Sequence, residues 1–491
     1  MATETRPVRS GVLREREFGV LLHLTSLPGA TTWGALGRAA DHFLDWLALS
    51  GAGVWQILPL GPVGADGSPY YARSTHAGNP RLIDVEALGA PGEGAGREGD
   101  EPFDRWHARA VAAAARALIG RGEPGFLEWR AAQSFWLDDY ALAVALAEEH
   151  ATSAWWEWPA ALRDREGTAL GTARARHAAR CLEVAAEQYL FHHQWRALRA
   201  RAAARGIRLF GDLPMYLAPD AVDVWVHREL FELDATGQPA TVAGVPPDYF
   251  AVDGQLWGNP VYRWSEHRRS GFAWWLERLG AELELCDFVR LDHFRALESY
   301  WAIPAGARAR DGVWCPAAGA ELLAAARERF ASLPIVAEDL GVITPAVEAL
   351  RDAFALPGMR VLQFGFDGNP SNVHLPHNWH GDVVAYTGTH DNDTLAGWLA
   401  GLDAGTRERV RAYVGSDSLQ EGLLRVLFGS VARLAVVPVQ DLVGLGSGAR
   451  MNVPGTVGDN WRWQLDWASV PSDLASRTRA LAARYARVRP G

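Results

Sequence analysis

The sequence predicts an α/β chain folded as a (β/α)8 TIM barrel, with inserted, largely helical subdomains and no separate C-terminal β-domain. Three observations lead to this fold class. Short apolar runs recur along the chain, helical stretches separate several of them, and acidic residues stand where runs end. Together they indicate a single (β/α)8 catalytic domain over residues 1–491.

Eight short runs have the composition of strands buried on both faces, as in a parallel sheet. Each is rich in apolar or β-branched residues and ends in a more polar stretch. They cover residues 18–24, 54–60, 207–213, 287–292, 334–338, 360–366, 383–389 and 434–440. A doubly wound sheet is the alternative, but no glycine-rich phosphate loop follows the first run.

Helical patterns lie between several of these runs, for example over residues 320–330 and 421–430. Thr344 and Pro345 begin another helix with an N-cap and a proline at the first helical position. Two intervals are longer than plain connections. We expect residues 61–206 to form a mainly helical insertion between barrel strands. We expect residues 214–285, rich in Pro, Gly and aromatic residues, to form a loop-rich insertion at the substrate cleft.

Charge and composition exclude several classes of protein. The formal net charge of −10 argues against nucleic acid or an anionic membrane as a partner. The polar N-terminus lacks the apolar core of a signal peptide, and no apolar run is long enough to span a membrane. The three cysteines form no CxxC spacing, so neither a disulfide framework nor a zinc site is expected. A cytoplasmic enzyme fits these observations.

Acidic residues stand at or just after the ends of four predicted strands. Asp212 lies near the end of the third run, Asp292 ends the fourth and Glu338 ends the fifth. His390 and Asp391 follow the seventh. The carboxyl ends of the strands in a barrel surround one mouth, so we expect these four carboxylates to converge there.

Carboxylates gathered in this way suit the cleavage of glycosidic bonds. One attacks the anomeric carbon, a second protonates the leaving oxygen, and a third holds sugar hydroxyls while the ring distorts. Like charges raise the pKa of one member and keep that acid protonated near neutral pH. Arg290, two residues before Asp292 on the same strand face, would favour the ionised nucleophile. Trp257, in the polar stretch GQLWGNP, could stack on a sugar ring.

Other interpretations of the same residues remain open at this point. An Asp that follows a strand often caps the next helix and does no chemistry. His293, His390 and the Asp391-Asn392-Asp393 stretch could instead hold a divalent cation, as in a metal-dependent lyase or isomerase. No HxxxH pair and no EF-hand-like loop supports such a metal site. A catalytically silent glycan-binding protein is a further alternative.

Longer motifs resemble the 4-α-glucanotransferases known as amylomaltase or disproportionating enzyme, which are relatives of the α-amylases. The resemblance covers nearly the whole chain. It includes GVLLHLTSLPG (19–29), SPYYARSTHAGNPRLID (68–84), GDLPMYLAPDAVDVW (211–225), VAGVPPDYFAVDGQLWGNPVY (242–262), VRLDHFRALESYWAIP (289–304), VAEDLGVITP (336–345), YTGTHDNDT (386–394) and QDLVGLGSGARMNVPGT (440–456).

The resemblance implies a retaining enzyme that moves a maltooligosaccharide from one α-1,4-glucan to the 4-hydroxyl of another glucan or of glucose. The reaction passes through a covalent glycosyl-enzyme and uses no cofactor and no metal. The expected partners are maltooligosaccharides and glucans derived from starch or glycogen, and the chain is expected to be a monomer or a weak homo-oligomer. An α-glucan hydrolase that uses water as the acceptor is the nearest alternative.

The same resemblance assigns roles to the catalytic residues. Asp292 is similar to the family's nucleophile, Glu338 to its general acid/base and Asp391 to its transition-state stabiliser. Arg290 and His390 occupy positions that hold the nucleophile and the bound sugar.

It also assigns substrate-binding positions. Tyr70 is expected beneath the sugar at the cleaved end, and Asp212 at the outer hydroxyls of that sugar. Asp248, Tyr249 and Phe250 lie in a stretch similar to the loop that arches over the acceptor side, so the 214–285 insertion is expected to form that side of the cleft. An aromatic loop would keep water from the intermediate and favour transfer over hydrolysis.

Overall fold

The structure is a computed structural model of the 491-residue chain, and it describes residues 12–13, 15–28, 36–64, 66–88, 101–247, 252–456 and 458–488. All eight predicted runs overlap a strand. These strands are β1 (Glu17–Leu21), β2 (Val54–Gln56), β3 (Arg208–Leu213), β6 (Phe288–Leu291), β9 (Ile335–Ala337), β10 (Gly358–Val361), β11 (Val383–Tyr386) and β12 (Leu434–Pro438). However, β1 begins one residue before its run, and β10 shares only residues 360–361 with the run 360–366.

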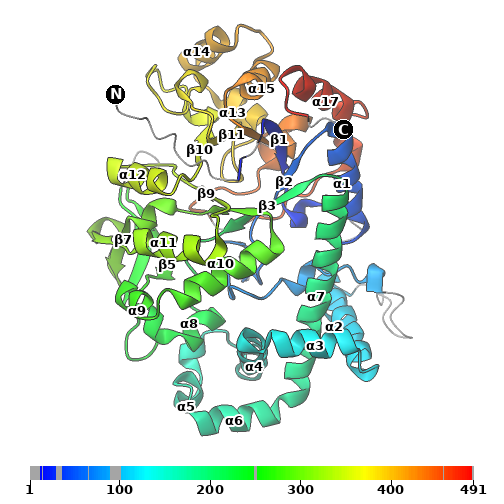
Figure 1. Cartoon of the computed structure of the whole chain (residues 1–491), viewed down its shortest axis with the longest axis vertical. Coiled ribbons are helices and arrows are strands. Elements are labelled where there is room, and N and C mark those ends of the chain that lie inside the picture. Colours follow the sequence, from blue (N-terminus) through cyan, green and yellow to red (C-terminus); the bar gives the residue numbers. More distant parts are fainter. Residues whose placement is uncertain are drawn as a thin grey trace.

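The eight strands pair in parallel in the order β10-β11-β12-β1-β2-β3-β6-β9 (Figure 1). The two ends of this order also meet, because the Ala337 N–H in β9 donates to the carbonyl of Pro357, directly before β10, at 2.8 Å. This bond closes the sheet into a barrel. The predicted (β/α)8 fold is therefore confirmed.

Helices follow the barrel strands in the pattern that the sequence predicts. Thr344 caps α12, because its hydroxyl accepts a hydrogen bond from the N–H of Val347. In the described residues outside the two insertions, the α-helices are α1 (Arg38–Ser50), α11 (Gly319–Phe330), α12 (Pro345–Ala353), α13 (Leu395–Gly401), α14 (Ala404–Val414), α15 (Leu419–Gly429), α16 (Val439–Val443) and α17 (Leu474–Arg484). Helix α10 (Ala273–Leu285) lies at the end of the predicted 214–285 insertion and leads into the next barrel strand. None of the helices in the described ranges is both long and apolar enough to cross a membrane.

Between β2 and β3 the described residues form six α-helices that extend away from the barrel, with α4, α5 and α6 at the far end in Figure 1. The helical insertion is interrupted at Gln133, which separates α3 from α4. The six helices are α2 (Phe103–Gly120), α3 (Pro124–Ala132), α4 (Ser134–His150), α5 (Ala160–Arg163), α6 (Gly167–Arg176) and α7 (Ala178–Ala204).

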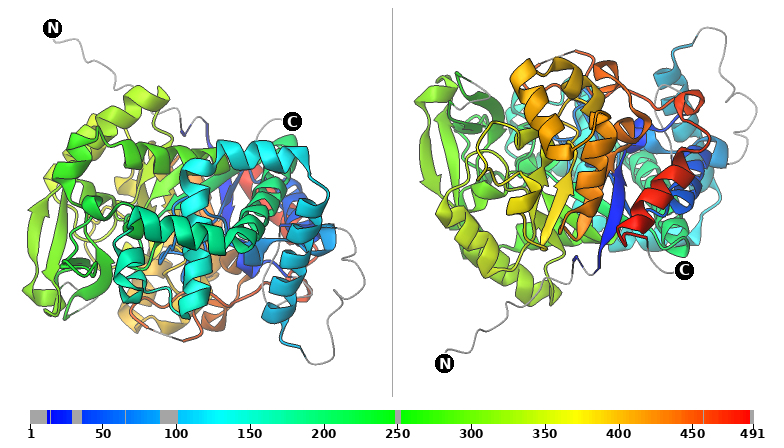
Figure 2. Two further views of the ribbon diagram at one scale, coloured as in Figure 1. Left: turned by 90° about the horizontal axis from the view of Figure 1, so that it is seen from below. Right: turned by 90° about the horizontal axis from the view of Figure 1, so that it is seen from above.

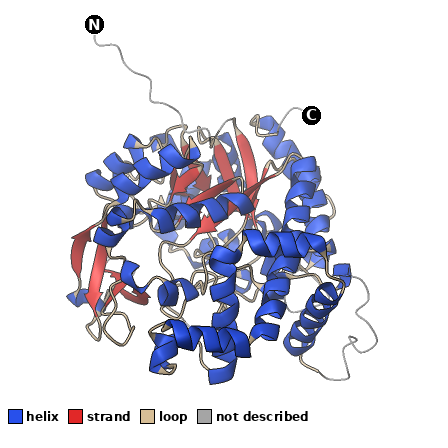
Figure 3. Cartoon of the chain, turned by 60° about the horizontal axis from the view of Figure 1, so that its bottom comes forward, coloured by secondary structure: helices blue, strands red, loops and turns tan. Residues whose placement is uncertain are grey.

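A second, antiparallel sheet stands apart from the barrel (Figure 3) and was not predicted from the sequence. Its order is β5-β4-β7-β8, with β4 (Thr241–Val245), β5 (Gln255–Pro260), β7 (Ser299–Pro304) and β8 (Val313–Pro316). Two short helices, α8 (Val222–Val226) and α9 (Trp264–Arg269), flank β4 and β5 in sequence. Since β7 begins just after the segment that carries Asp292, this sheet lies next to the barrel mouth.

The barrel interior separates an apolar layer from a polar layer. The rings of Phe210 and Phe288 stack inside the barrel with their centres 4.3 Å apart. Two residues further along the same strands come Asp212 and Arg290, which point to the same side because side chains alternate along a strand. The polar groups therefore lie above an apolar floor, at the carboxyl ends of the strands.

The last described residues close the opposite end of the barrel. Arg487 is fully buried, and its guanidinium donates hydrogen bonds to main-chain carbonyls that include those of Glu17 and Arg433, at the starts of β1 and β12. Further bonds reach the carbonyls of Phe428 and Ala432. Figure 2 shows the blue strand β1 beside the orange C-terminal part of the chain. One cation thus ties the C-terminal segment to the seam between the first and last barrel strands.

Candidate active site

An arginine links two of the predicted acids at the barrel mouth. Asp212 in β3 and Arg290 in β6 are direct partners in the sheet register. Nη1 of Arg290 lies 2.8 Å from both carboxylate oxygens of Asp212, and Nη2 lies 2.8 Å from Oδ1 of Asp292. Burial raises the pKa of Asp212 to about 6, although the charge of Arg290 acts in the opposite direction. The two strands thereby place Asp212 and Asp292 on either side of one guanidinium.

Glu338 follows β9 and is fixed by main-chain donors. Its Oε2 accepts from the N–H of His293 at 2.8 Å, and its Oε1 accepts from the N–H of Leu340 at 2.9 Å. The bond to His293 depends on a left-handed turn, since His293 has φ 47°. Because His293 directly follows Asp292, this turn connects the two acids through one stretch of main chain.

The environment of Glu338 favours its protonated form more than water does. The side chain is buried, and burial raises its pKa to about 7, against the opposing charge of Arg290. Asp292 is more exposed, at 28%, and is ion-paired with Arg290. The two acids therefore differ in their surroundings, as a proton donor and a charged nucleophile require.

Asp391 lies after β11 and is held by groups from the C-terminal segment. Its Oδ1 accepts from Nδ2 of Asn452 at 2.7 Å, and its main-chain carbonyl accepts from Arg450 at 2.9 Å. Nε2 of His390 is 3.4 Å from Oδ2 of Asp391. Burial opposes ionisation of Asp391, but the charge of His390 and the hydrogen bonds from His390 and Asn452 hold its pKa below its usual range.

Tyr70 comes from the loop after β2 and completes the polar cluster. Its hydroxyl donates to Oδ2 of Asp212 at 2.7 Å. Its ring stacks on the ring of His390, with centres 5.0 Å apart and planes 17° apart, and lies 5.9 Å from Trp461. Side chains that are far apart in sequence thus form one continuous site.

The antiparallel sheet contributes Trp257 to the border of this site. Trp257 lies on β5, and its ring meets the ring of His293 edge-on, with centres 4.8 Å apart. Of the residues predicted for the acceptor side, Asp248, Tyr249 and Phe250 lie outside the described residues. Every other predicted site residue is brought to the barrel mouth or its edge.

A sequence profile described as 4-alpha-glucanotransferase matches residues 22–469. The chain belongs to the 4-α-glucanotransferase family. The resemblance seen in its motifs is therefore confirmed, and the chain is an enzyme of this family.

Similar proteins span nearly the same length. A 4-alpha-glucanotransferase from Thermus thermophilus is 46% identical over 490 residues, covering 95% of this chain and 98% of that protein. The chloroplastic/amyloplastic 4-alpha-glucanotransferase of Solanum tuberosum is 38% identical over 499 residues, covering 96% of this chain and 87% of its own. Among solved structures, amylomaltase from Streptococcus agalactiae in complex with acarbose matches with a TM-score of 0.92 and 34% identity, over 97% of this chain and all of that chain.

Two other interpretations of these acids, as helix caps and as metal ligands, can be compared with the structure. Thr394, not Asp391, caps helix α13, since its hydroxyl accepts from the N–H of Gly397. Asp393 is engaged locally, with its two oxygens accepting from the Thr394 N–H and from Ser447. In the described ranges, no group of three or more His, Cys, Asp or Glu side chains is placed to hold a metal ion.

Sequence reasoning missed two residues of this cluster. Arg450 and Asn452 hold Asp391, and both lie in an irregular stretch after β12, where no periodicity marks a buried face. The ARMN stretch within the family-like motif at 440–456 was the available signal. Trp461, which packs against Tyr70 and His390, lies in the polar stretch GDNWRW, where a tryptophan, like Trp257, is expected to be able to stack on a sugar ring.

Proposed function

We propose that the enzyme transfers a maltooligosaccharide from one α-1,4-glucan to the 4-hydroxyl of another glucan or of glucose, through a covalent glycosyl-enzyme. The observation that carries this proposal is the pair Asp292 and Glu338, connected by the turn at His293. Asp292 is ion-paired with Arg290, and Glu338 accepts from the N–H of His293 and has a pKa of about 7. A retaining reaction needs this combination of a charged nucleophile and a protonated acid, about 5–5.5 Å apart.

In the first step, a carboxylate oxygen of Asp292 forms a bond to C1 of the donor sugar while the bond from C1 to the leaving O4 breaks. Glu338 gives its proton to that O4. The donor's non-reducing part is then esterified to Asp292, and the shorter glucan or glucose departs. Positive charge develops on the sugar ring as the bond breaks, and the ionised Asp391 stabilises it.

In the second step, ionised Glu338 takes the proton from the acceptor's 4-hydroxyl. The acceptor oxygen bonds to C1, and the bond from C1 to Asp292 breaks, so both acids return to their starting forms. Two inversions at C1 leave the product in the α configuration of the donor.

The remaining side chains of the cluster would bind the sugar at the cleaved end. Asp212 offers buried oxygens to the outer hydroxyls, and its partner Arg290 keeps the two acids in place. The flat face of Tyr70 is backed by His390, which suits stacking beneath a sugar ring. The two rings supply a flat face and the two charged side chains supply polar contacts, and a polar, ring-shaped substrate needs both.

We further propose that the 214–285 insertion forms the acceptor side, because Trp257 on β5 lies against His293 at the site border. Asp248, Tyr249 and Phe250 belong to this proposal through their motif.

The expected partners are maltooligosaccharides and glucans from starch or glycogen, which fits the acarbose complex of the Streptococcus agalactiae amylomaltase. A cytoplasmic monomer or weak homo-oligomer also remains our expectation, and light scattering of the purified enzyme would give the state.

Incubation with maltotriose tests transfer directly. We expect glucose together with a ladder of maltooligosaccharides longer than the substrate, because a sugar acceptor held in the site reacts faster than free water. Chromatography of the products over time is the measurement. Glucose and maltose as the only products would show that the enzyme is a hydrolase instead.

The rate is expected to depend on the protonation of Glu338. Its pKa is raised to about 7, so the acid is protonated below this pH and is lost as pH rises through it. We therefore expect kcat/KM for maltotriose to fall by about tenfold per pH unit above about pH 7. A maltosyl fluoride donor is the control. Fluoride departs without a proton, so the fall of kcat/KM above about pH 7 should be much shallower for this donor. An equally steep fall of kcat/KM above about pH 7 for both donors would contradict the assignment of Glu338 as the general acid.

A further inference from the structure

One buried carboxylate joins the two ends of the loop that carries His390 and Asp391. The loop runs from Thr387, just after β11, to Leu395, at the start of α13. Oδ2 of Asp441 accepts from the hydroxyl of Thr387 at 2.6 Å, and Oδ1 accepts from the N–H of Leu395 at 2.7 Å. Asp441 is 1% exposed and belongs to α16, directly after the neighbouring strand β12. Its contacts therefore fix the separation of the loop's two ends.

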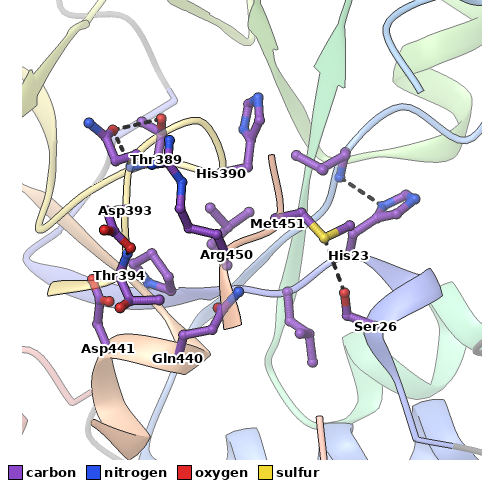
Figure 4. A pocket seen from close by; sticks show the side chains of 15 residues that line it. His23, Ser26, Thr389, His390, Asp393, Thr394, Gln440, Asp441, Arg450 and Met451 are labelled. Carbon is purple, nitrogen blue, oxygen red and sulfur yellow. Dashed lines mark hydrogen bonds between the residues drawn. The ribbon is translucent and has the colours of Figure 1, made fainter. Parts of the chain in front are cut away.

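The middle of the loop is also held closely. The side-chain amide of Gln363 donates to the carbonyl of Asp393 at 2.8 Å, and Arg450 donates to the carbonyl of Asp391 at 2.9 Å. Figure 4 looks into the cavity beneath the loop, with Thr389 and His390 on one side and Asp441 below Thr394. The cavity volume is about 30 Å³, which is room for about one water molecule.

We infer that Asp441 is a positioning residue for Asp391: by holding both ends of the 387–395 loop, it sets where the Asp391 carboxylate meets the transition state. This inference rests on the transition-state role proposed for Asp391. Asp441 contacts neither Glu338 nor Asp292 through any hydrogen bond in the described part of the chain, so its effect would pass through the loop.

The chemistry of a carboxylate suits this task. Two oxygens diverge from one carbon and can accept from two donors at once. Removing the side chain would leave the Leu395 N–H and the Thr387 hydroxyl buried without an acceptor. The loop would move to satisfy them, and a displacement of about 1 Å at a reacting group can cost about 100-fold in rate.

Steady-state disproportionation of maltotriose by the full-length enzyme tests the inference. We expect Asp441→Ala to lower kcat by about 100-fold while KM changes by less than about threefold, because Asp391 acts mainly on the transition state. Asp441→Asn should recover kcat to within about fivefold of the wild type, since its oxygen still accepts from Leu395 and its amide can donate to Thr387. A kcat for Asp441→Ala within about threefold of the wild type would overturn the inference.

A milder variant covers the case in which Asp441→Ala does not fold. Thr387→Val keeps the shape of the side chain but removes one of the two donors. We expect kcat to fall by about tenfold, with KM again little changed. An unchanged kcat in folded Thr387→Val would overturn the inference.

Glu187 provides the control. It is also a buried carboxylate, but it lies on α7 in the helical insertion, where it accepts from Nη1 of Arg180 at 2.8 Å. Glu187→Ala should lower the thermal midpoint as Asp441→Ala does, yet leave kcat within about threefold of the wild type. An equal fall in kcat for both variants would overturn the inference, since any lost buried carboxylate would then suffice.

A double-variant cycle separates this inference from the proposed function. A maltosyl fluoride donor raises the residual rates to a measurable level. If Asp441 acts through Asp391, adding Asp441→Ala to Asp391→Ala should change kcat by less than about threefold. If the effects of the two substitutions on kcat multiply, the inference about Asp441 is wrong and the proposed function still stands. Full activity of the single Asp391→Ala variant would instead overturn the proposed role of Asp391.

Discussion

Replacing Asp292 by Ala is expected to lower kcat for maltotriose disproportionation by at least about 10⁴-fold, because the covalent intermediate cannot form without its nucleophile. Replacing Glu338 by Ala should cost a similar factor, since both steps lose their proton transfer. Stopped assays with product chromatography measure these rates. Asp287→Ala is the control: Asp287 precedes the same strand β6 at the opposite end of the barrel, where it accepts from the N–H of Leu209. Its kcat should stay close to that of the wild type.

Azide can distinguish the two roles. With a maltosyl fluoride donor, azide entering the space left by Asp292→Ala would attack C1 directly and give a β-glycosyl azide, inverted relative to the donor. In Glu338→Ala, azide would attack the glycosyl-enzyme and give an α-glycosyl azide. The opposite assignment of anomers would exchange the two roles, and wild-type rates in either variant would remove that residue from the mechanism.

Replacing Arg290 by Met is expected to have the second-largest effect. Arg290 is 6% exposed and pairs with both Asp212, which is fully buried, and Asp292. Breaking a buried charge pair by removing one partner costs about 3–5 kcal/mol, so the free energy of unfolding should fall by this amount. We also expect kcat/KM to fall by at least about 10³-fold, because two acids lose their shared anchor.

Chemical denaturation and steady-state kinetics measure the two effects of this change. Arg308→Met is the control, because Arg308 pairs with Asp311 on the surface and such pairs contribute less than about 1 kcal/mol. Arg290→Lys should recover little activity, since an ammonium cannot reproduce the planar contacts to two carboxylates. Unfolding of Arg290→Met at the wild-type denaturant concentration would contradict the assigned role of the pair.

The barrel was predictable because its strands carry a local signal. Runs such as 383–389 and 434–440 are short and mainly apolar, a composition typical of a strand that is covered on both sides. The acids at the strand ends follow from the same topology, since parallel strands bring Asp292, Glu338 and Asp391 to one rim. Their chemical roles could not be separated by position, and the motifs supplied the assignment.

The antiparallel sheet could not be predicted by the same reasoning. β5 (QLWGNP) and β8 (VWCP) contain Gly or Pro and show no regular alternation, so neither has a strand pattern of its own. β4 pairs with β7, although β5 and the barrel strand β6 lie between them in sequence. The two strands meet only once the barrel has folded. Asn452 and Asp441 were missed for a related reason, because their partners lie in a loop more than forty residues away in sequence.

The buried Arg487 affects the order in which the chain can fold during synthesis. β1 emerges early, yet its partner β12 begins at Leu434, and the cation that ties their starts together comes at residue 487. A nascent chain therefore holds β1 with one unpaired edge until β12 has been made, and exposed strand edges are prone to aggregate. Translation that stalls just before β12 would leave this seam open in a barrel whose other seven strands have already been made.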